Sequence, residues 1–246
     1  MPAISKTANY HTRNQDNVGA ATGNGRTAFY LLDGHGDTAE RLTHSVLPSI
    51  LARELTEPSL NPSSVMRLVD DMLTTWVYGG TTFTGVVVDE DKITTINLGD
   101  SRTVVVSASG KVMHVTEEHQ PTSKREAERI AQAGGRVEMG RINGMIAVSR
   151  ALGDYVYKAT TPPLMSNAAD VAELTLEQPV YVVIMSDGMW VSASFEDVLR
   201  EIVFQVMRIP PSPTPEDLHA TGAHLVDMFA DGLDDCTAAV AYVFPK

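Results

Sequence analysis

One arrangement recurs along the sequence: an apolar stretch ends at an aspartate that is followed by glycine or a small polar residue. It occurs in LLDGHG at Asp33, in NLGDSR at Asp100 and in IMSDGMW at Asp187, and a related GLDDCT places Asp234 before the last apolar stretch. A turn explains any one of them equally well, because aspartate is a poor strand former. Four together predict a shared site, since carboxylates that converge at one edge of packed sheets repel each other unless cations or protons neutralise them.

The ligand types in this pattern favour divalent ions that prefer oxygen. Carboxylates, backbone carbonyls and water suit Mg²⁺ or Mn²⁺, whereas a single cysteine, Cys236, excludes a multi-cysteine zinc site. Gly34 allows a tight turn after Asp33 and leaves its own carbonyl available as a ligand. Two such ions about 3.5–4 Å apart can activate a water and hold a phosphoryl group, so hydrolysis of a phosphate ester fits best. In that context His35 could donate a proton to a departing alkoxide, although a lone histidine is more often structural.

Composition limits the alternatives. The chain has 246 residues, of which 43% are hydrophobic and 20% charged, so it can bury a full core without disulfides. Its formal charge of −12 disfavours nucleic acid and anionic membranes as partners. The N-terminus lacks the apolar core of a signal peptide, and no stretch approaches the roughly 20 apolar residues that span a bilayer. We therefore expect a soluble monomer of the cytoplasm or the nucleus.

Hydrophobic patterning predicts the elements that carry these residues. Short apolar runs rich in β-branched residues predict strands at residues 28–32, 82–88, 93–98, 103–106, 180–185 and 238–244. Apolar residues at three- and four-residue steps predict helices at 38–55, 65–77, 124–133, 195–207 and 216–228. The DEDK sequence at 89–92 indicates a hairpin turn. Because strands come in clusters rather than alternating strictly with helices, the order predicts an antiparallel α+β sandwich.

The motifs, taken in order, resemble the metal-dependent protein phosphatase 2C family of serine/threonine phosphatases. They are RNQD, DGHG, GTT, GDSR, EEHQP, the long stretch EAERIAQAGGRVEMGRINGMIAVSRALGD, SDGMW and DDCT, and they span nearly the whole chain. The resemblance implies a four-layer α-β-β-α sandwich in which helix pairs flank two central antiparallel sheets. It also implies one catalytic domain over residues 1–246, with a short flap at about 155–171.

The resemblance further implies hydrolysis of phosphoserine and phosphothreonine in proteins by a water that bridges two Mg²⁺ or Mn²⁺ ions. Asp33 would bridge both ions, and the carbonyl of the glycine after it would bind one. Asp187 and Asp234 would complete the other site. Asp100 would help to hold a weaker third ion together with Asp187. His35 would be the general acid that protonates the serine or threonine oxygen.

Near the first motif the sequence departs from the family pattern. Gln15 stands beside Asp16 where many members have glutamate, and both would belong to the metal site, with the neutral amide weakening it. The arginine that binds the substrate phosphate is replaced by His11, while Arg13 lies two residues nearer to the motif aspartate. Asp235 replaces the usual asparagine, and its charge could tighten cation binding or disturb local hydrogen bonds.

Two other functions remain open. These departures also suit a catalytically impaired phosphatase-like domain that serves as a binding or regulatory module. A metal phosphoesterase acting on a nucleotide or sugar phosphate would share the same site. We expect Arg150 and Asp154, in the long motif, to form a scaffolding pair rather than to act in catalysis.

Overall fold

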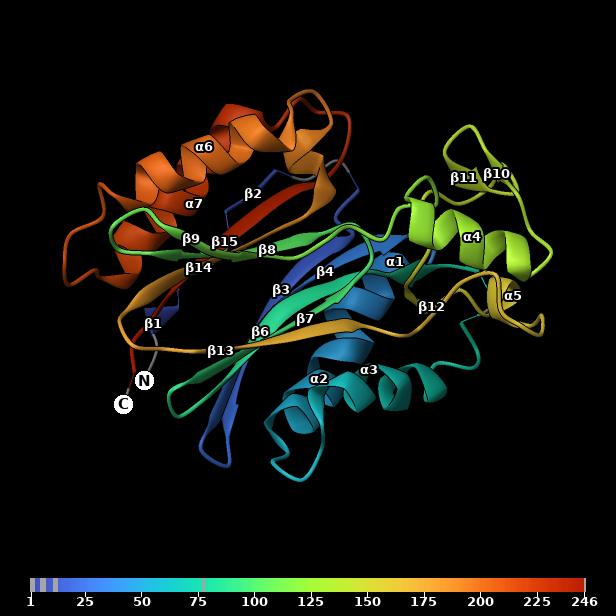
Figure 1. Ribbon diagram of the computed structural model, residues 1–246, viewed down its shortest axis with the longest axis horizontal. Helices are drawn as coiled ribbons and strands as arrows, with labels where there is room; N and C mark the ends of the chain where they lie inside the picture. The colour runs from blue at the N-terminus through green and yellow to red at the C-terminus, as the bar shows by residue number, and fades with distance from the viewer. Residues whose placement is uncertain (1–2, 5–7, 11–12, 77, 246) are drawn as a thin grey trace.

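Two antiparallel β-sheets pack together, and helices cover their outer faces (Figure 1). The computed structural model describes residues 3–4, 8–10, 13–76 and 78–245. The strands are β1 (Ala3–Ile4), β2 (Ala8–Tyr10), β3 (Asp16–Gly23), β4 (Arg26–His35), β5 (Gly80–Thr81), β6 (Phe83–Asp89), β7 (Lys92–Leu98), β8 (Arg102–Ser107), β9 (Val112–Val115), β10 (Val137–Glu138), β11 (Arg141–Ile142), β12 (Leu152–Gly153), β13 (Asp170–Thr175), β14 (Val180–Met185) and β15 (Cys236–Val243). The helices are α1 (Ala39–Arg41), a π-helical turn (Leu42–Val46), α2 (Leu47–Thr56), α3 (Pro62–Asp71), α4 (Lys124–Gln132), α5 (Tyr155–Lys158), a 3-10 turn (Asp187–Trp190), α6 (Phe195–Val206) and α7 (Pro215–Phe229).

The first sheet has the strand order β12-β5-β4-β6-β7-β13, and β3 pairs with β4. Strands β6 and β7 form the hairpin expected at DEDK, with Asp89 opposite Lys92. The long strand β4 shows how the sheet is buried. Ala28, Tyr30 and Leu32 belong to the core cluster that also contains residues of α2 and α3. Successive side chains of a strand point to opposite faces, so this face of β4 packs on the helices.

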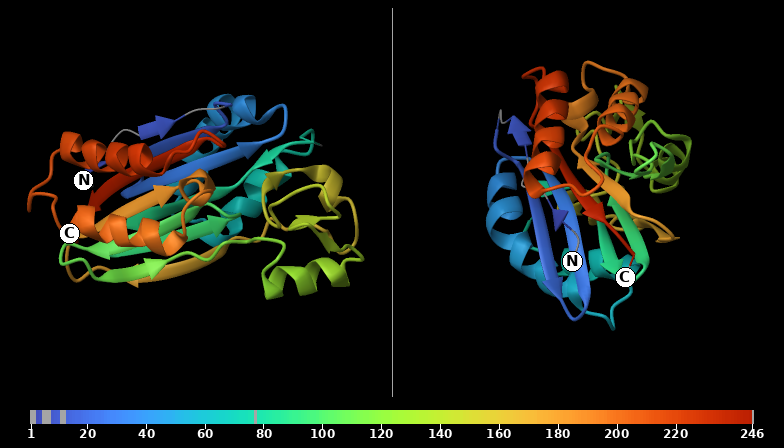
Figure 2. Two further views of the ribbon diagram at one scale, coloured as in Figure 1. Left: turned by 90° about the horizontal axis from the view of Figure 1, so that it is seen from above. Right: turned by 90° about the vertical axis from the view of Figure 1, so that its left-hand side faces the viewer.

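The second sheet has the order β1-β15-β14-β8-β9, and β2 pairs with β15. Tyr181, Val183 and Met185 of β14 pack in a cluster with residues of α6 and α7. In the same cluster, the Cys236 thiol donates to the sulfur of Met189 across 3.2 Å. Figure 2 shows α6 and α7 outside this sheet, on the side away from α2 and α3.

The two sheets pack against each other through the side chains of β4 and β14 that point away from the helices. Phe29 and Leu31 of β4 share a buried cluster with Val182 and Ile184 of β14. Both strands are therefore buried on both faces, which explains why their sequences are continuously apolar rather than alternating. The α+β class with antiparallel sheets is confirmed.

The predicted elements differ from the observed ones in a few places. Helix 38–55 contains a π-helical turn between α1 and α2, and the helix expected at 65–77 begins earlier and ends at Asp71. Strands β3 and β13 were not predicted, because neither contains a continuous run of β-branched residues. The short strands β1, β2, β5, β9, β10, β11 and β12 and the short helix α5 were not predicted either. Within the described residues, none of the helices is both long and apolar enough to cross a lipid bilayer.

The register places the four motif aspartates at strand ends. Asp33 lies near the end of β4, Asp100 two residues after β7, Asp187 two residues after β14, and Asp234 two residues before β15. Strands β4 and β7 belong to the first sheet, and β14 and β15 belong to the second. Helices α4 and α5 and the β10–β11 hairpin form a lobe beside the same end of the sandwich (Figures 1 and 2).

A buried ion pair fixes this lobe to the sandwich. The guanidinium of Arg150 donates to Glu126 Oε1 at 2.6 and 3.0 Å and to Asp170 Oδ1 at 2.8 Å. The side chains of Arg150 and Glu126 are 3% and 1% exposed. The expected pair between Arg150 and Asp154 is wrong, because Asp154 binds His35 instead, with 2.5 Å between Oδ2 and the ring Nε2.

We expect Arg150→Met to lower the free energy of unfolding by about 3 kcal/mol, because the variant leaves Glu126 buried without its main cation. Urea unfolding measures the change. The double variant Arg150→Met/Glu126→Gln is the control. Its free energy of unfolding should fall less, since it also removes the unpaired charge of Glu126. A loss below about 1 kcal/mol in the single variant would show that the pair does not hold the lobe.

Candidate functional site

A pocket of about 380 Å³ opens at the end of the sandwich where the motif aspartates lie. Asp33, Asp100, Asp187 and Asp234 all line it, together with His35. Since Asp33 and Asp100 come from one sheet and the other two from the second sheet, the pocket straddles the junction between the sheets. The convergence expected from the sequence is present.

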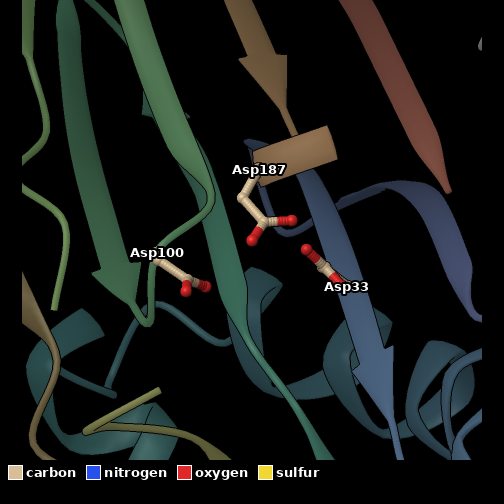
Figure 3. A group of neighbouring side chains, drawn as sticks. All are labelled: Asp33, Asp100 and Asp187. Carbon is tan, nitrogen blue, oxygen red and sulfur yellow. The ribbon is translucent and has the colours of Figure 1, made fainter. Parts of the chain in front are cut away.

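Three of these carboxylates form a tight group. One carboxylate oxygen from each of Asp33, Asp100 and Asp187 lies within 4.8 Å of the other two. Figure 3 shows the carboxylates of Asp33 and Asp187 pointing toward each other, with Asp100 close by. Asp234 lies outside this group; it is exposed, and its Oδ1 accepts the backbone N–H of Asp235 at 2.9 Å.

The electrostatics of the group match its geometry. Burial, followed by repulsion from Asp16, Asp187, Asp100 and Asp234, raises the pKa of Asp33 well above its ordinary value. Burial and the charge of Asp187 do the same to the pKa of Asp100. Burial and the charge of Asp234 raise the pKa of Asp187 to about 6. The ionised form of each carboxyl is disfavoured until positive charge reaches the pocket.

Asp16 adds a further carboxylate behind the pocket. It lies directly opposite Asp33 in the register of β3 and β4, but it does not line the pocket. Its side chain is 1% exposed, and the hydroxyls of Ser186 and Thr237 lie close enough to favour its charged form. Burial outweighs them and raises the pKa of Asp16 to about 7. Carboxylate oxygens are the hard donors that Mg²⁺ and Mn²⁺ prefer, and Asp33, Asp100 and Asp187 bring three of them together, so the residues present fit divalent ions.

Gly34 holds the edge of the pocket in a space that excludes any side chain. A Cβ atom there would lie 2.8 Å from the backbone oxygen of Gln15 and 2.8 Å from Cβ of Ala39. The N–H of Gly34 donates to that same Gln15 oxygen at 3.2 Å. This close approach ties the end of β4 to the chain just before β3, and Gly34 itself lines the pocket.

The segment before β3 is held by the unusual aspartate of the last motif. Asp235 accepts the backbone N–H of Arg13 at 2.8 Å and that of Gln15 at 2.6 Å. Asp235 is buried, and it makes hydrogen bonds with the backbone around it rather than disturbing them. Arg13 and Gln15 both line the pocket, and the Gln15 amide donates to the carbonyl of Gly36 at 2.8 Å. His11 lies outside the described residues.

Several pocket residues were not identified from the sequence. Arg141, Met145 and Tyr157 come from the lobe and line the pocket together with Asp154. Residues 141–148 therefore border the site in addition to the start of the expected flap. The available signal for Asp154 was its Leu-Gly-Asp sequence, which it shares with Asp100.

Comparison with known proteins agrees with this geometry. The model of the family described as "Protein phosphatase 2C" matches residues 12–207. Protein phosphatase 1B of Bos taurus is 40% identical over 139 residues, which cover 54% of this chain and 28% of that protein. The probable protein phosphatase 1N of Mus musculus is 36% identical over 232 residues, covering 86% of this chain and 56% of that protein. The chain thus spans only part of the length of these relatives.

A solved structure extends the likeness to the whole fold. The crystal structure of a phosphatase from Toxoplasma gondii superposes with a TM-score of 0.81 at 17% identity, covering 99% of this chain and 95% of that one. At that identity the match concerns the fold alone. The family model, by contrast, covers the segment that supplies Asp33, Asp100 and Asp187 to the pocket. The chain therefore belongs to the protein phosphatase 2C family.

Proposed function

We propose that the chain is a serine/threonine protein phosphatase that removes phosphate from phosphoproteins with the help of Mg²⁺ or Mn²⁺. The family is metal-dependent, and the observation that carries the proposal is the group of three carboxylates in the pocket, whose ligand oxygens lie within 4.8 Å of one another. His35 and two arginines, Arg13 and Arg141, line the same pocket. Location in the cytoplasm or the nucleus and a monomeric state stay predictions from the sequence.

The first metal ligands we propose are those that the family resemblance implies, and Asp33, Gly34, Asp100, Asp187 and Asp234 all line the pocket. Asp33 would hold both ions, and the carbonyl of Gly34 would bind one of them. Asp187 and Asp234 would complete the second site, and Asp100 with Asp187 would hold a weaker third ion. Asp16 supports the site from behind, and the amide of Gln15 stays bound to the Gly36 carbonyl. When bound, such ions neutralise the carboxylates and polarise the phosphate and the attacking water.

The remaining groups act on the substrate. The guanidinium of Arg13 would bind the phosphate, because it is the cation that the segment before β3 brings to the pocket. His35 would protonate the serine or threonine oxygen as the bond to phosphorus breaks. The bound ions and Arg13 would therefore neutralise the charge of the phosphate, and His35 would supply the proton that an alkoxide needs to depart.

The first test removes one metal ligand. We expect Asp187→Asn to lower Mn²⁺-dependent turnover of a phosphothreonine peptide at least about 100-fold, because the neutral amide weakens ion binding. A chelator should abolish turnover of the unchanged protein. Asp227→Asn on the exposed face of α7 is the matched control and should keep full activity.

An unchanged protein that shows no turnover at millimolar Mn²⁺ would favour the binding module. Turnover of small phosphomonoesters in preference to phosphopeptides would favour the phosphoesterase.

The second test removes the ions and varies the pH. The pKa is about 6 for Asp187 and about 7 for Asp16 in the folded chain, against 3.8 for an ordinary aspartate. Between pH 8 and about 5 the metal-free folded chain therefore takes up protons before the unfolded chain does, so its free energy of unfolding rises as the pH falls. We expect a gain of about 1–3 kcal/mol by urea unfolding in chelator. Added Mn²⁺ should shrink this gain. If the metal-free protein instead lost stability from pH 8 to 6, the claim that the buried carboxylates repel one another would be contradicted.

The third test concerns the proton donor. We expect His35→Ala to lower kcat on a phosphoserine peptide about 100-fold and on an aryl phosphate less than about threefold, since an aryl oxide departs without a proton. The comparison uses saturating Mn²⁺ for both substrates. Equal losses on the two substrates would remove His35 from that role.

A further inference from the structure

A two-residue strand brings two distant parts of the chain to one point. Strand β5 pairs with β4, where His35 lies opposite Gly80, and with β12, where Gly153 lies opposite the same Gly80. Asp154 follows Gly153, so it reaches His35 across β5 although 119 residues separate the two in sequence. The contact is therefore a product of the sheet register.

Gly80 makes room for this contact. A Cβ atom at Gly80 would collide with Oδ2 of Asp154, the oxygen that binds His35. Asp154 adopts a left-handed conformation with φ of 51°, which an aspartate tolerates better than most residues. Any side chain at Gly80 would push the carboxylate away from the imidazole.

The carboxylate of Asp154 is held on its other side as well. Its Oδ1 accepts the N–H of Gly79 at 3.1 Å, and its own N–H donates to the Gly79 carbonyl at 3.1 Å. Its side chain is 2% exposed, against 27% for His35. The fixed member of the pair is thus Asp154, and the ring of His35 takes its orientation from it.

A second anchor lies behind the same turn. Asp70 of α3 accepts the N–H of Gly153 at 2.8 Å and binds the ammonium of Lys158 at 2.7 and 2.8 Å. It also accepts the side-chain amide of Asn167 at 2.9 Å. Asp70 holds the backbone next to Asp154 without touching His35, which makes it a natural control.

We propose that Asp154 is the positioning residue for the proton donor of this enzyme. It accepts the N–H at Nε2 of His35, which fixes the plane of the ring and leaves Nδ1 to hand over a proton. In the reaction, a water oxygen bonds to phosphorus, the bond from phosphorus to the serine or threonine oxygen breaks, and the Nδ1 proton moves to that oxygen. The neutral imidazole that remains carries its proton on Nε2, the tautomer that Asp154 binds. Both protons of the water leave with the phosphate as H₂PO₄⁻, and His35 regains its proton from solvent. This inference rests on the proposed phosphatase activity.

The kinetic test separates positioning from folding. We expect Asp154→Ala to lower kcat on a phosphothreonine peptide about 10- to 100-fold with little change in KM, and to lower kcat on an aryl phosphate less than about threefold. In a His35→Ala background the same substitution should have no further effect on the peptide. Asp70→Asn, the control for a loosened turn, should affect both substrates alike. Equal losses of Asp154→Ala on both substrates, or a full further loss in the His35→Ala background, would overturn the proposal.

A measurement without turnover keeps the two proposals apart. In a ¹H–¹⁵N spectrum of the imidazole rings, the His35 signal is identified by its disappearance in His35→Ala. We expect Asp154→Asn to move the His35 Nε2 resonance, because Gly79 and His35 contact different oxygens of Asp154 and the amide places an oxygen at only one of those two positions. An unmoved resonance would overturn the positioning role. Absence of Mn²⁺-dependent turnover in the unchanged protein would overturn the phosphatase proposal instead, while the resonance still reports whether Asp154 holds the ring.

Discussion

Repulsion between carboxylates that folding brings together is the constraint on which the rest of the structure depends. Asp33 and Asp100 come from one sheet and Asp187 from the other, so the group exists only when the two sheets are packed. Side chains such as Leu31 and Ile184 fix that packing through the cluster between the sheets. The apolar faces of β4 and β14 thus supply the free energy that holds like charges side by side, and a bound cation would reduce the repulsion that remains.

The central strands could be predicted from the sequence because they are buried on both faces. Strands that are partly exposed could not be predicted in this way. Strands β4 and β14 are apolar at every position that packs against a helix or the opposite sheet, so composition alone located them. Strand β13 alternates between half-buried and exposed side chains, and β3 has glycine or alanine at four of its eight positions. Their place in the sheet comes from pairing with a neighbour, which a single sequence does not display.

The site was predictable where local sequence carries the chemistry. Each of three apolar strands is followed or ended by an aspartate, namely Asp33, Asp100 and Asp187. This pattern is local in the sequence, so it can be recognised without knowing how the strands pair. The pairing of Asp154 with His35 could not be foreseen in this way, because it depends on the register of β5 and on the missing side chain of Gly80. The same holds for Asp235, whose two hydrogen bonds to the backbone cross more than 200 residues of sequence.

The burial of Cys236 has a practical consequence for experiments on this chain. Its thiol lies beneath α7, is 1% exposed, and has its pKa raised to about 12 by burial and by the nearby carboxylates. The thiolate, which is the species that maleimides and iodoacetamide attack, is therefore scarce at neutral pH. Because the chain contains no second cysteine, a cysteine introduced on the lobe would be the reactive thiol for a fluorophore or spin label, with no need to replace the native one.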